Sequence, residues 1–85
     1  MDLERSANMS CRIGMTTNLE QRKAYWEGQY STLKDWQILA GPLSSKAEAQ
    51  RKETELAKKY GCESHPGGDD PDYTGAKWYV YGFNY

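Results

Sequence analysis

A carboxylate interrupts an apolar stripe in the second half of the chain. Glu53 lies four residues after Ala49 and three residues before Leu56, so all three share one face if this segment is a helix. A carboxylate at such a position costs free energy unless it is paired, bound to a metal or placed at the edge of the stripe. Carboxylate oxygen is the ligand that a hard divalent cation such as Mg²⁺ or Mn²⁺ prefers. Glu53 is therefore a candidate metal ligand.

A guanidinium group has a similar position in the first half of the chain. Arg22 lies three residues after Leu19 and four before Trp26, which holds it against the inward face of its helix. The planar fork of arginine suits a phosphate group. Two interpretations follow. Arg22 and Glu53 either flank their stripes or pair with each other, or they form a site that binds a cation on the carboxylate and a phosphate on the guanidinium.

Two helices are predicted to carry these charged residues. Each begins at a capping box, in which a hydroxyl residue and a glutamate stand three positions apart. The pairs are Thr17–Glu20 and Ser45–Glu48. The first helix is expected to end at Gly28 and the second at Gly61, since glycine commonly terminates helices.

Three strands are predicted around the helices. Residues 9–15 alternate apolar and polar side chains, residues 35–40 form a strand stopped by Gly41 and Pro42, and residues 78–83 are aromatic and β-branched. The order predicts a small α/β domain over residues 9–85, a βαβαβ sandwich after a tail of residues 1–8. We expect a three-stranded, mainly antiparallel or mixed sheet with both helices on one face.

The composition limits the classes of function. The 85 residues have a net charge of -1, so binding to nucleic acid would need a local basic patch. The candidate residues for that patch are Arg12, Lys23, Arg51 and Lys52. With a mean hydropathy of -0.95 and a charged start, the chain is predicted to have no membrane segment and to be cytoplasmic.

The remaining reactive side chains are two cysteines, one histidine and a group of aspartates. Cys11 and Cys62 stand far apart and are expected to be buried free thiols, because a disulfide would need an oxidising compartment. His65, in a loop, is either exposed or a general base. The nearby acidic residues form either a plain turn or a calcium or magnesium site. They are Asp69, Asp70 and Asp72.

The run Gly-Met-Thr-Thr-Asn-Leu-Glu-Gln-Arg at residues 14–22 resembles the second half of the GIY-YIG endonuclease module. In that family a strand ending in a Tyr-Ile-Gly-like triplet leads through a Thr/Asn turn into a helix. An arginine eight residues after the glycine is catalytic, and Arg22 has that spacing from Gly14. A glutamate of a later helix binds the single divalent metal, and Glu53 matches it. The resemblance covers about residues 11–62 and implies a GIY-YIG-like domain, a nuclease that uses Mg²⁺ or Mn²⁺.

The sequence departs from the family's pattern at its first strand. The triplet here is Arg12-Ile13-Gly14, and residues 1–10 contain no Gly-Ile-Tyr strand. We hypothesise that the C-terminal strand takes the vacant place, as in a permuted module. It would bring Tyr79 and Tyr81, which share one face, into the site as catalytic residues. The alternative is that both tyrosines only pack at a sheet edge.

A second class of function stays open beside the nuclease. The chain could keep the GIY-YIG fold without catalysis and act as a module that binds nucleic acid or protein. A protein partner or a homodimer is compatible with its near-neutral charge and its eleven aromatic residues.

Overall fold

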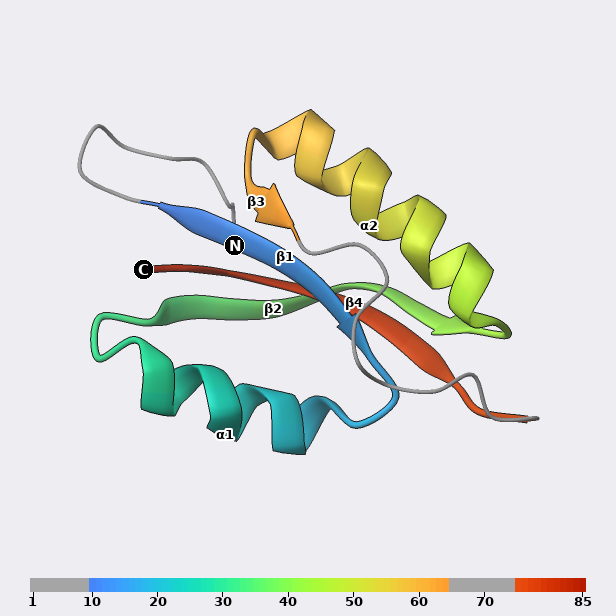
Figure 1. Ribbon diagram of the computed structural model, residues 1–85, viewed down its shortest axis with the longest axis horizontal. Helices are drawn as coiled ribbons and strands as arrows, with labels where there is room; N and C mark the ends of the chain where they lie inside the picture. Colours follow the sequence, from blue (N-terminus) through green and yellow to red (C-terminus); the bar gives the residue numbers. More distant parts are fainter. Residues whose placement is uncertain (1–9, 65–74) are drawn as a thin grey trace.

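The computed structural model describes residues 10–64 and 75–85 (Figure 1). Its elements are β1 (Cys11–Thr16), α1 (Leu19–Gln29), β2 (Lys34–Leu43), α2 (Lys46–Tyr60), β3 (Glu63–Ser64) and β4 (Trp78–Asn84). They confirm a small α/β domain with two helices and a mixed sheet. The prediction of three strands is wrong, because the short β3 adds a fourth. Two residues are too few to show a strand periodicity.

The strand order in the sheet is β2-β4-β1-β3. β4 pairs antiparallel with both β1 and β2, and β3 pairs parallel with β1. The C-terminal strand is therefore an interior strand next to β1, and the alternative that its tyrosines only pack at a sheet edge is wrong. This position places Tyr81 directly opposite Gly14 in the register.

The two helices cover opposite faces of the sheet (Figure 1). Side chains alternate along a strand. Ile13 and Val80 pack in the core under α2, whereas Tyr81 and Phe83 contact Trp26 of α1. The expectation of both helices on one face is wrong. β4 carries large apolar side chains on both of its faces, so each face needs a helix to cover it.

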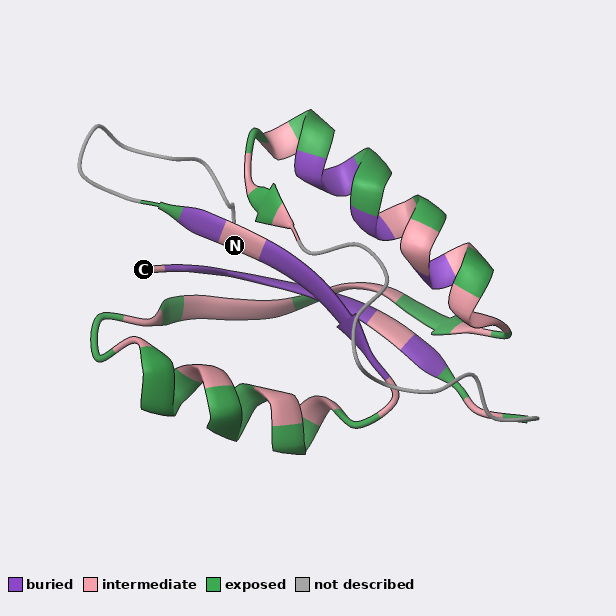
Figure 2. Cartoon of the chain, viewed as in Figure 1, coloured by how far each residue is buried: buried purple, intermediate pink, exposed green. Residues whose placement is uncertain are grey.

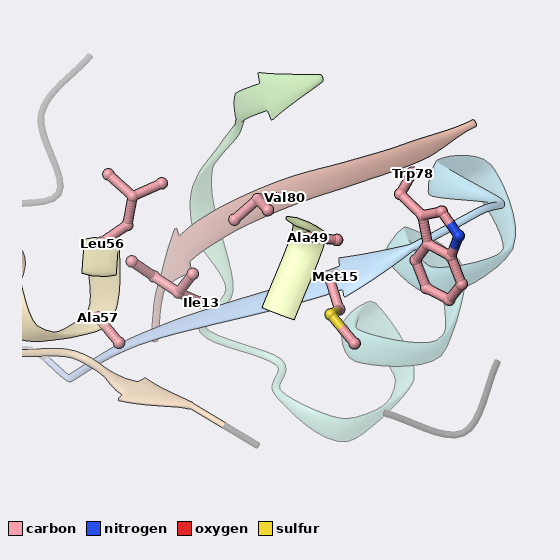
Figure 3. Close-up of a cluster of buried hydrophobic side chains, with 7 residues drawn as sticks. All are labelled: Ile13, Met15, Ala49, Leu56, Ala57, Trp78 and Val80. Atoms are coloured by element: carbon pink, nitrogen blue, oxygen red, sulfur yellow. The ribbon is translucent and has the colours of Figure 1, made fainter. Parts of the chain in front are cut away.

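The main hydrophobic core lies between α2 and the sheet (Figure 3). Its buried members are Ile13, Met15, Ala49, Leu56, Ala57, Trp78 and Val80. The alternation predicted for the first strand is confirmed, since Ile13 and Met15 point to this core. Figure 2 shows buried positions along the inner side of α2 and none on α1.

The ends of α2 follow the prediction. The Ser45 hydroxyl accepts a hydrogen bond from the backbone N–H of Glu48 at 3.2 Å. At the other end Gly61 has a left-handed backbone, with φ of 66°, and its N–H bonds to the carbonyl of Ala57. The capping box and the terminating glycine are therefore confirmed.

The ends of α1 differ from the prediction. Asn18, not Thr17, caps the helix, and its side-chain oxygen accepts from the N–H of Gln21 at 3.0 Å. Thr and Asn are both competent caps, and the sequence offers them at adjacent positions. The helix also continues through Gly28 to Gln29, because one glycine in a helix costs only about 1 kcal/mol relative to alanine.

The strand predicted to stop at Gly41 and Pro42 extends to Leu43. The Gly41-Pro42 peptide is cis, and Gly41 has a φ of 125°. β2 is an edge strand, where a proline is tolerated because its missing N–H faces away from the sheet.

The two cysteines form a disulfide, so the prediction of free thiols is wrong. Cys11 starts β1 and Cys62 follows α2, with their Cα atoms 4.9 Å apart. The parallel pairing of β1 with β3, which sets Arg12 opposite Glu63, brings the preceding residues together. Disulfides persist mainly in oxidising compartments, so the cytoplasmic location stays a prediction.

Candidate functional site

Tyr81 of β4 lies at the centre of the candidate site and is tightly held. Its ring lies over Gly14 of β1. A Cβ atom added to this glycine would lie 2.3 Å from the tyrosine oxygen. Trp36 of β2 stacks on the same ring with centroids 4.6 Å apart. The side chain is only 2% exposed. The position of the hydroxyl is therefore set by three strands.

The hydroxyl of Tyr81 meets α1 and several charges. The indole Nε1 of Trp26 donates a hydrogen bond to it at 2.8 Å. Burial raises the pKa of Tyr81 to about 12, although the Trp26 hydrogen bond and the Arg22 charge lower this pKa. The Glu53 charge raises it further. At neutral pH the group is therefore a neutral phenol, which can donate or accept a hydrogen bond but is a poor base.

Arg22 and Glu53 lie on the helices that cover the two opposite faces of the sheet, and Tyr81 lies on the face of α1. Arg22, on α1, is half-buried, and its guanidinium lies 5.5 Å from the ring centroid of Tyr25. Glu53, on α2, is 1% exposed. It therefore does not reach the solvent at the edge of its apolar stripe. The charges of both residues shift the pKa of Tyr81, but the sheet separates Glu53 from Arg22 and from the Tyr81 hydroxyl.

Tyr79 has different contacts from Tyr81. Its ring lies over Gly41 of β2, where an added Cβ would be 2.6 Å from its Cδ1 atom. Tyr81 instead lies over Gly14 of β1. The two tyrosines lean in opposite directions across β4, and within the described ranges only Tyr81 bonds to α1. A catalytic role for Tyr79 stays a prediction without a contact that supports it.

Arg12 of β1 lies on the α1 side of the sheet. Its guanidinium is 4.9 Å from the ring centroid of Trp26, a cation–π distance. The same group is 3.6 Å from the Glu63 carboxylate. Its charge also lowers the pKa of Tyr81. Arg12, predicted only as a nucleic-acid contact, therefore belongs to the same cluster as Tyr81.

The other three predicted nucleic-acid contacts do not join this cluster into one patch. Lys23, on α1, is 3.7 Å from Glu27. Arg51 and Lys52 are on α2, over the opposite face, and Lys52 is 3.6 Å from Glu55. The four basic residues are thus divided between the two faces of the sheet.

Sequence reasoning missed the role of two tryptophans. The sequence places Trp26 on the apolar stripe of its helix and Trp36 in the predicted strand 35–40, and it predicts no further role for either residue. One signal was available for Trp26, because it stands four residues after Arg22 and so lies on the same helical face. No sequence signal pairs Trp36 with Tyr81, since that contact depends on the register of β2 against β4.

Glu53 is the residue predicted to bind a hard divalent cation. Within residues 10–64 and 75–85 no group of three or more His, Cys, Asp or Glu side chains could hold a metal ion. Mg²⁺ commonly binds one or two carboxylates and keeps water and phosphate oxygens as its other ligands. Glu53 is a single carboxylate, and at 1% exposure it has no open side for water and phosphate ligands in this structure. The alternatives at His65, Asp69, Asp70 and Asp72 lie outside the described residues.

Comparison of the chain with protein-family models, curated proteins and solved structures finds no match. Neither of the two described helices is long and apolar enough to span a membrane.

Proposed function

We propose that this chain is a permuted GIY-YIG-like domain that cleaves phosphodiester bonds of nucleic acid with a divalent metal. The observation that carries the proposal is the interior position of β4 beside β1. A tyrosine from the far end of the chain thereby lies over Gly14, the glycine of the triplet. Arg22 and Glu53 stand at the spacings of the family, and the charges of both shift the pKa of Tyr81. Arg22 lies on the same side of the sheet as Tyr81, and Glu53 lies on the other side.

The three side chains have separate roles in this proposal. Glu53 would hold Mg²⁺ or Mn²⁺, which neutralises phosphate charge and lowers the pKa of bound water. Arg22 binds the phosphate oxygens and stabilises the charge that develops on them. Tyr81, neutral at pH 7 because its pKa is about 12, donates a hydrogen bond that orients the phosphate or the attacking water. One water is consumed: its oxygen bonds to phosphorus, the ester P–O bond breaks, and a proton released by that water passes through solvent to the leaving oxygen.

The metal role is tested with Glu53→Gln. The matched control is Glu55→Gln, because Glu55 is an exposed carboxylate on the same helix. NMR line broadening by Mn²⁺ should centre on Glu53 and its neighbours in the wild type and in Glu55→Gln, and vanish in Glu53→Gln. The wild type and Glu55→Gln should also cleave branched or single-stranded DNA, and Glu53→Gln should not. Equal broadening in a folded Glu53→Gln protein would contradict the metal role.

The phosphate role is tested with Arg22→Gln. Lys58→Gln is the control, since it removes an exposed positive charge of α2 that has no predicted role in the site. We expect Arg22→Gln to reduce the cleavage rate by about a hundredfold, the scale of a lost transition-state contact. Lys58→Gln should retain most of the rate. Equal losses in the two variants would mean that only the overall charge matters.

The burial of Glu53 and Tyr81 favours a second candidate function. At 1% and 2% exposure, these side chains suit a domain that keeps the fold and binds nucleic acid or protein without catalysis. In that case Mn²⁺ gives no site-specific broadening in the wild type, and DNA is bound but not cleaved. The same titration therefore separates the two functions.

A further inference from the structure

Trp26 of α1 contacts two residues of the candidate site with two different parts of its side chain. Its indole N–H donates to the Tyr81 hydroxyl at 2.8 Å. Its ring face lies 4.9 Å from the guanidinium carbon of Arg12. One side chain of a helix thereby holds a residue of β4 and a residue of β1.

The hydrogen bond fixes the direction of the Tyr81 hydroxyl. An indole N–H can only donate, so the tyrosine oxygen must accept. The hydrogen of that hydroxyl is then directed away from Trp26 and is available to another acceptor. The indole also favours the charged form of the phenol, since it lowers the pKa of Tyr81 against the effect of burial.

The ring face restricts Arg12. The Trp26 ring covers one side of the Arg12 guanidinium and leaves its N–H groups to reach a carboxylate or a phosphate elsewhere. Glu63 lies at one such position, 3.6 Å away. The side chain of Arg12 is 19% exposed, so it is not closed off from a ligand.

Trp26 also contributes to holding α1 on the sheet. No residue of α1 is buried, and contact with the sheet is made by aromatic rings. Trp26 lies 5.6 Å from Phe83 and is stacked on Tyr30, which itself lies 6.2 Å from Phe83. Arg22 stands one helical turn before Trp26, so its position depends on this contact.

We propose that Trp26 is a positioning residue, which directs the Tyr81 hydroxyl and the Arg12 guanidinium toward a phosphate group of the ligand. The proposal rests on the proposed function, and it assigns Trp26 no contact with the reacting atoms.

The test compares Trp26→Phe with Trp36→Phe. Both variants keep an aromatic ring beside Tyr81 or Phe83, but only the first removes the N–H that bonds to Tyr81. Incorporation of 3-fluorotyrosine lowers the phenol pKa into an accessible range, and Tyr81→Phe assigns its ¹⁹F signal. We expect Trp26→Phe to raise the pKa of Tyr81 by about one unit, the scale of one hydrogen bond. An unchanged pKa in Trp26→Phe, or an equal shift in Trp36→Phe, overturns the proposal.

DNA cleavage with Mn²⁺ tests whether this positioning matters for the reaction. Trp26→Phe should lower the rate by about tenfold, as loss of an outer hydrogen-bond partner often does, and Trp36→Phe should lower it less. A shifted pKa with an unchanged rate overturns the positioning role and leaves the proposed function intact.

Inorganic phosphate tests the proposal when the wild type does not cleave DNA. Lack of cleavage contradicts the proposed function by itself. Phosphate-dependent NMR shifts at Arg12 and Tyr81 in the wild type that are lost in Trp26→Phe still support positioning by Trp26. Equal shifts in both proteins, or none in either, overturn it.

Discussion

The two faces of the sheet are built from different chemistry. The core under α2 is mostly aliphatic, with Trp78 as its buried aromatic residue, and the Cys11–Cys62 disulfide links β1 to the end of that helix. The face under α1 is aromatic and contains a partly buried hydrogen bond between Trp26 and Tyr81. Its rings are Trp26, Tyr30, Trp36, Tyr81 and Phe83.

The helices differ in the same way. α2 buries four residues, Ala49, Glu53, Leu56 and Ala57, whereas α1 buries none. Burial of apolar surface is the main stabilising term in folding, so most of the stability should come from the α2 face. The α1 face can then hold polar and charged groups with less effect on the fold. Glu53 is the exception, since it places a charge in the stable face.

The largest effect should come from the disulfide on the α2 face. The bond closes a loop over a sequence separation of 51 residues. Loop-closure entropy predicts that the double variant Cys11→Ala, Cys62→Ala loses about 4 kcal/mol of unfolding free energy. Urea denaturation of this variant and of the oxidised wild type measures the difference. Addition of reductant should destabilise the wild type alone, and a reductant effect on the variant would contradict this explanation.

A glycine on the α1 face should be almost as sensitive. In Gly14→Ala the new Cβ would lie 2.3 Å from the Tyr81 oxygen and 2.5 Å from its Cζ. The Tyr81 ring, which lies between Gly14 and Trp36, has to shift. This shift should lower the unfolding free energy by about 3 kcal/mol, the upper range for overpacking. Gly28→Ala is the control, because nothing lies within 4 Å of its added Cβ.

Gly28→Ala should stabilise the protein by about 0.5–1 kcal/mol, since alanine is the better residue within a helix. Thermal and urea denaturation measure both glycine variants. If Gly14→Ala is as stable as the wild type, Tyr81 is not held over β1 as described, and the α1 face is looser than its contacts indicate.

The alkaline limit of stability should depend on Tyr81. Burial raises its pKa from 10.0 to about 12 in the folded protein. Between these values the unfolded chain releases a proton that the folded chain keeps, so unfolding free energy falls as pH rises. The total loss should be about 2–3 kcal/mol, and Tyr81→Phe should remove it.

Tyr25→Phe is the control, because Tyr25 is 48% exposed. Urea denaturation at a series of pH values from 9 upward gives the slope of the unfolding free energy against pH for each protein. Tyr85, whose pKa is also raised to about 12 by burial and by Glu63, contributes a slope of the same sign to all three proteins. Identical slopes in the wild type and Tyr81→Phe would refute the buried, protonated state of Tyr81.

The sequence predicted best what local spacing determines. The period of two in the first strand, the Ser45 cap and the terminating Gly61 depend on neighbours within a few residues, and all three are present. The inward position of Glu53 followed from helical spacing, and the residue is buried.

Long-range features could not be predicted in the same way. The disulfide depends on β3, a strand of two residues that leaves no pattern. Assignment of both helices to one face failed because the pattern does not show that β4 is interior. The bond from Trp26 to Tyr81 spans 55 positions, and only the order of the strands brings them together.

The smallest effect concerns the two helix caps. Asn18 accepts from the Gln21 N–H at the start of α1, and Ser45 accepts from the Glu48 N–H at the start of α2. Replacement of either cap by alanine should cost about 1 kcal/mol. Urea denaturation measures this loss, which should be similar in Asn18→Ala and Ser45→Ala.

Amide hydrogen exchange should distinguish the two cap variants even where their unfolding free energies are equal. α1 has no buried residue, so loss of its cap should increase amide hydrogen exchange throughout the first turns of α1, up to the turn that carries Arg22. In Ser45→Ala the apolar contacts of Ala49 with the core should confine the increase to the first turn of α2. If exchange increases over equally many residues in the two helices, the aromatic contacts hold α1 as firmly as the core holds α2. Arg22 would then be as rigidly placed as Glu53.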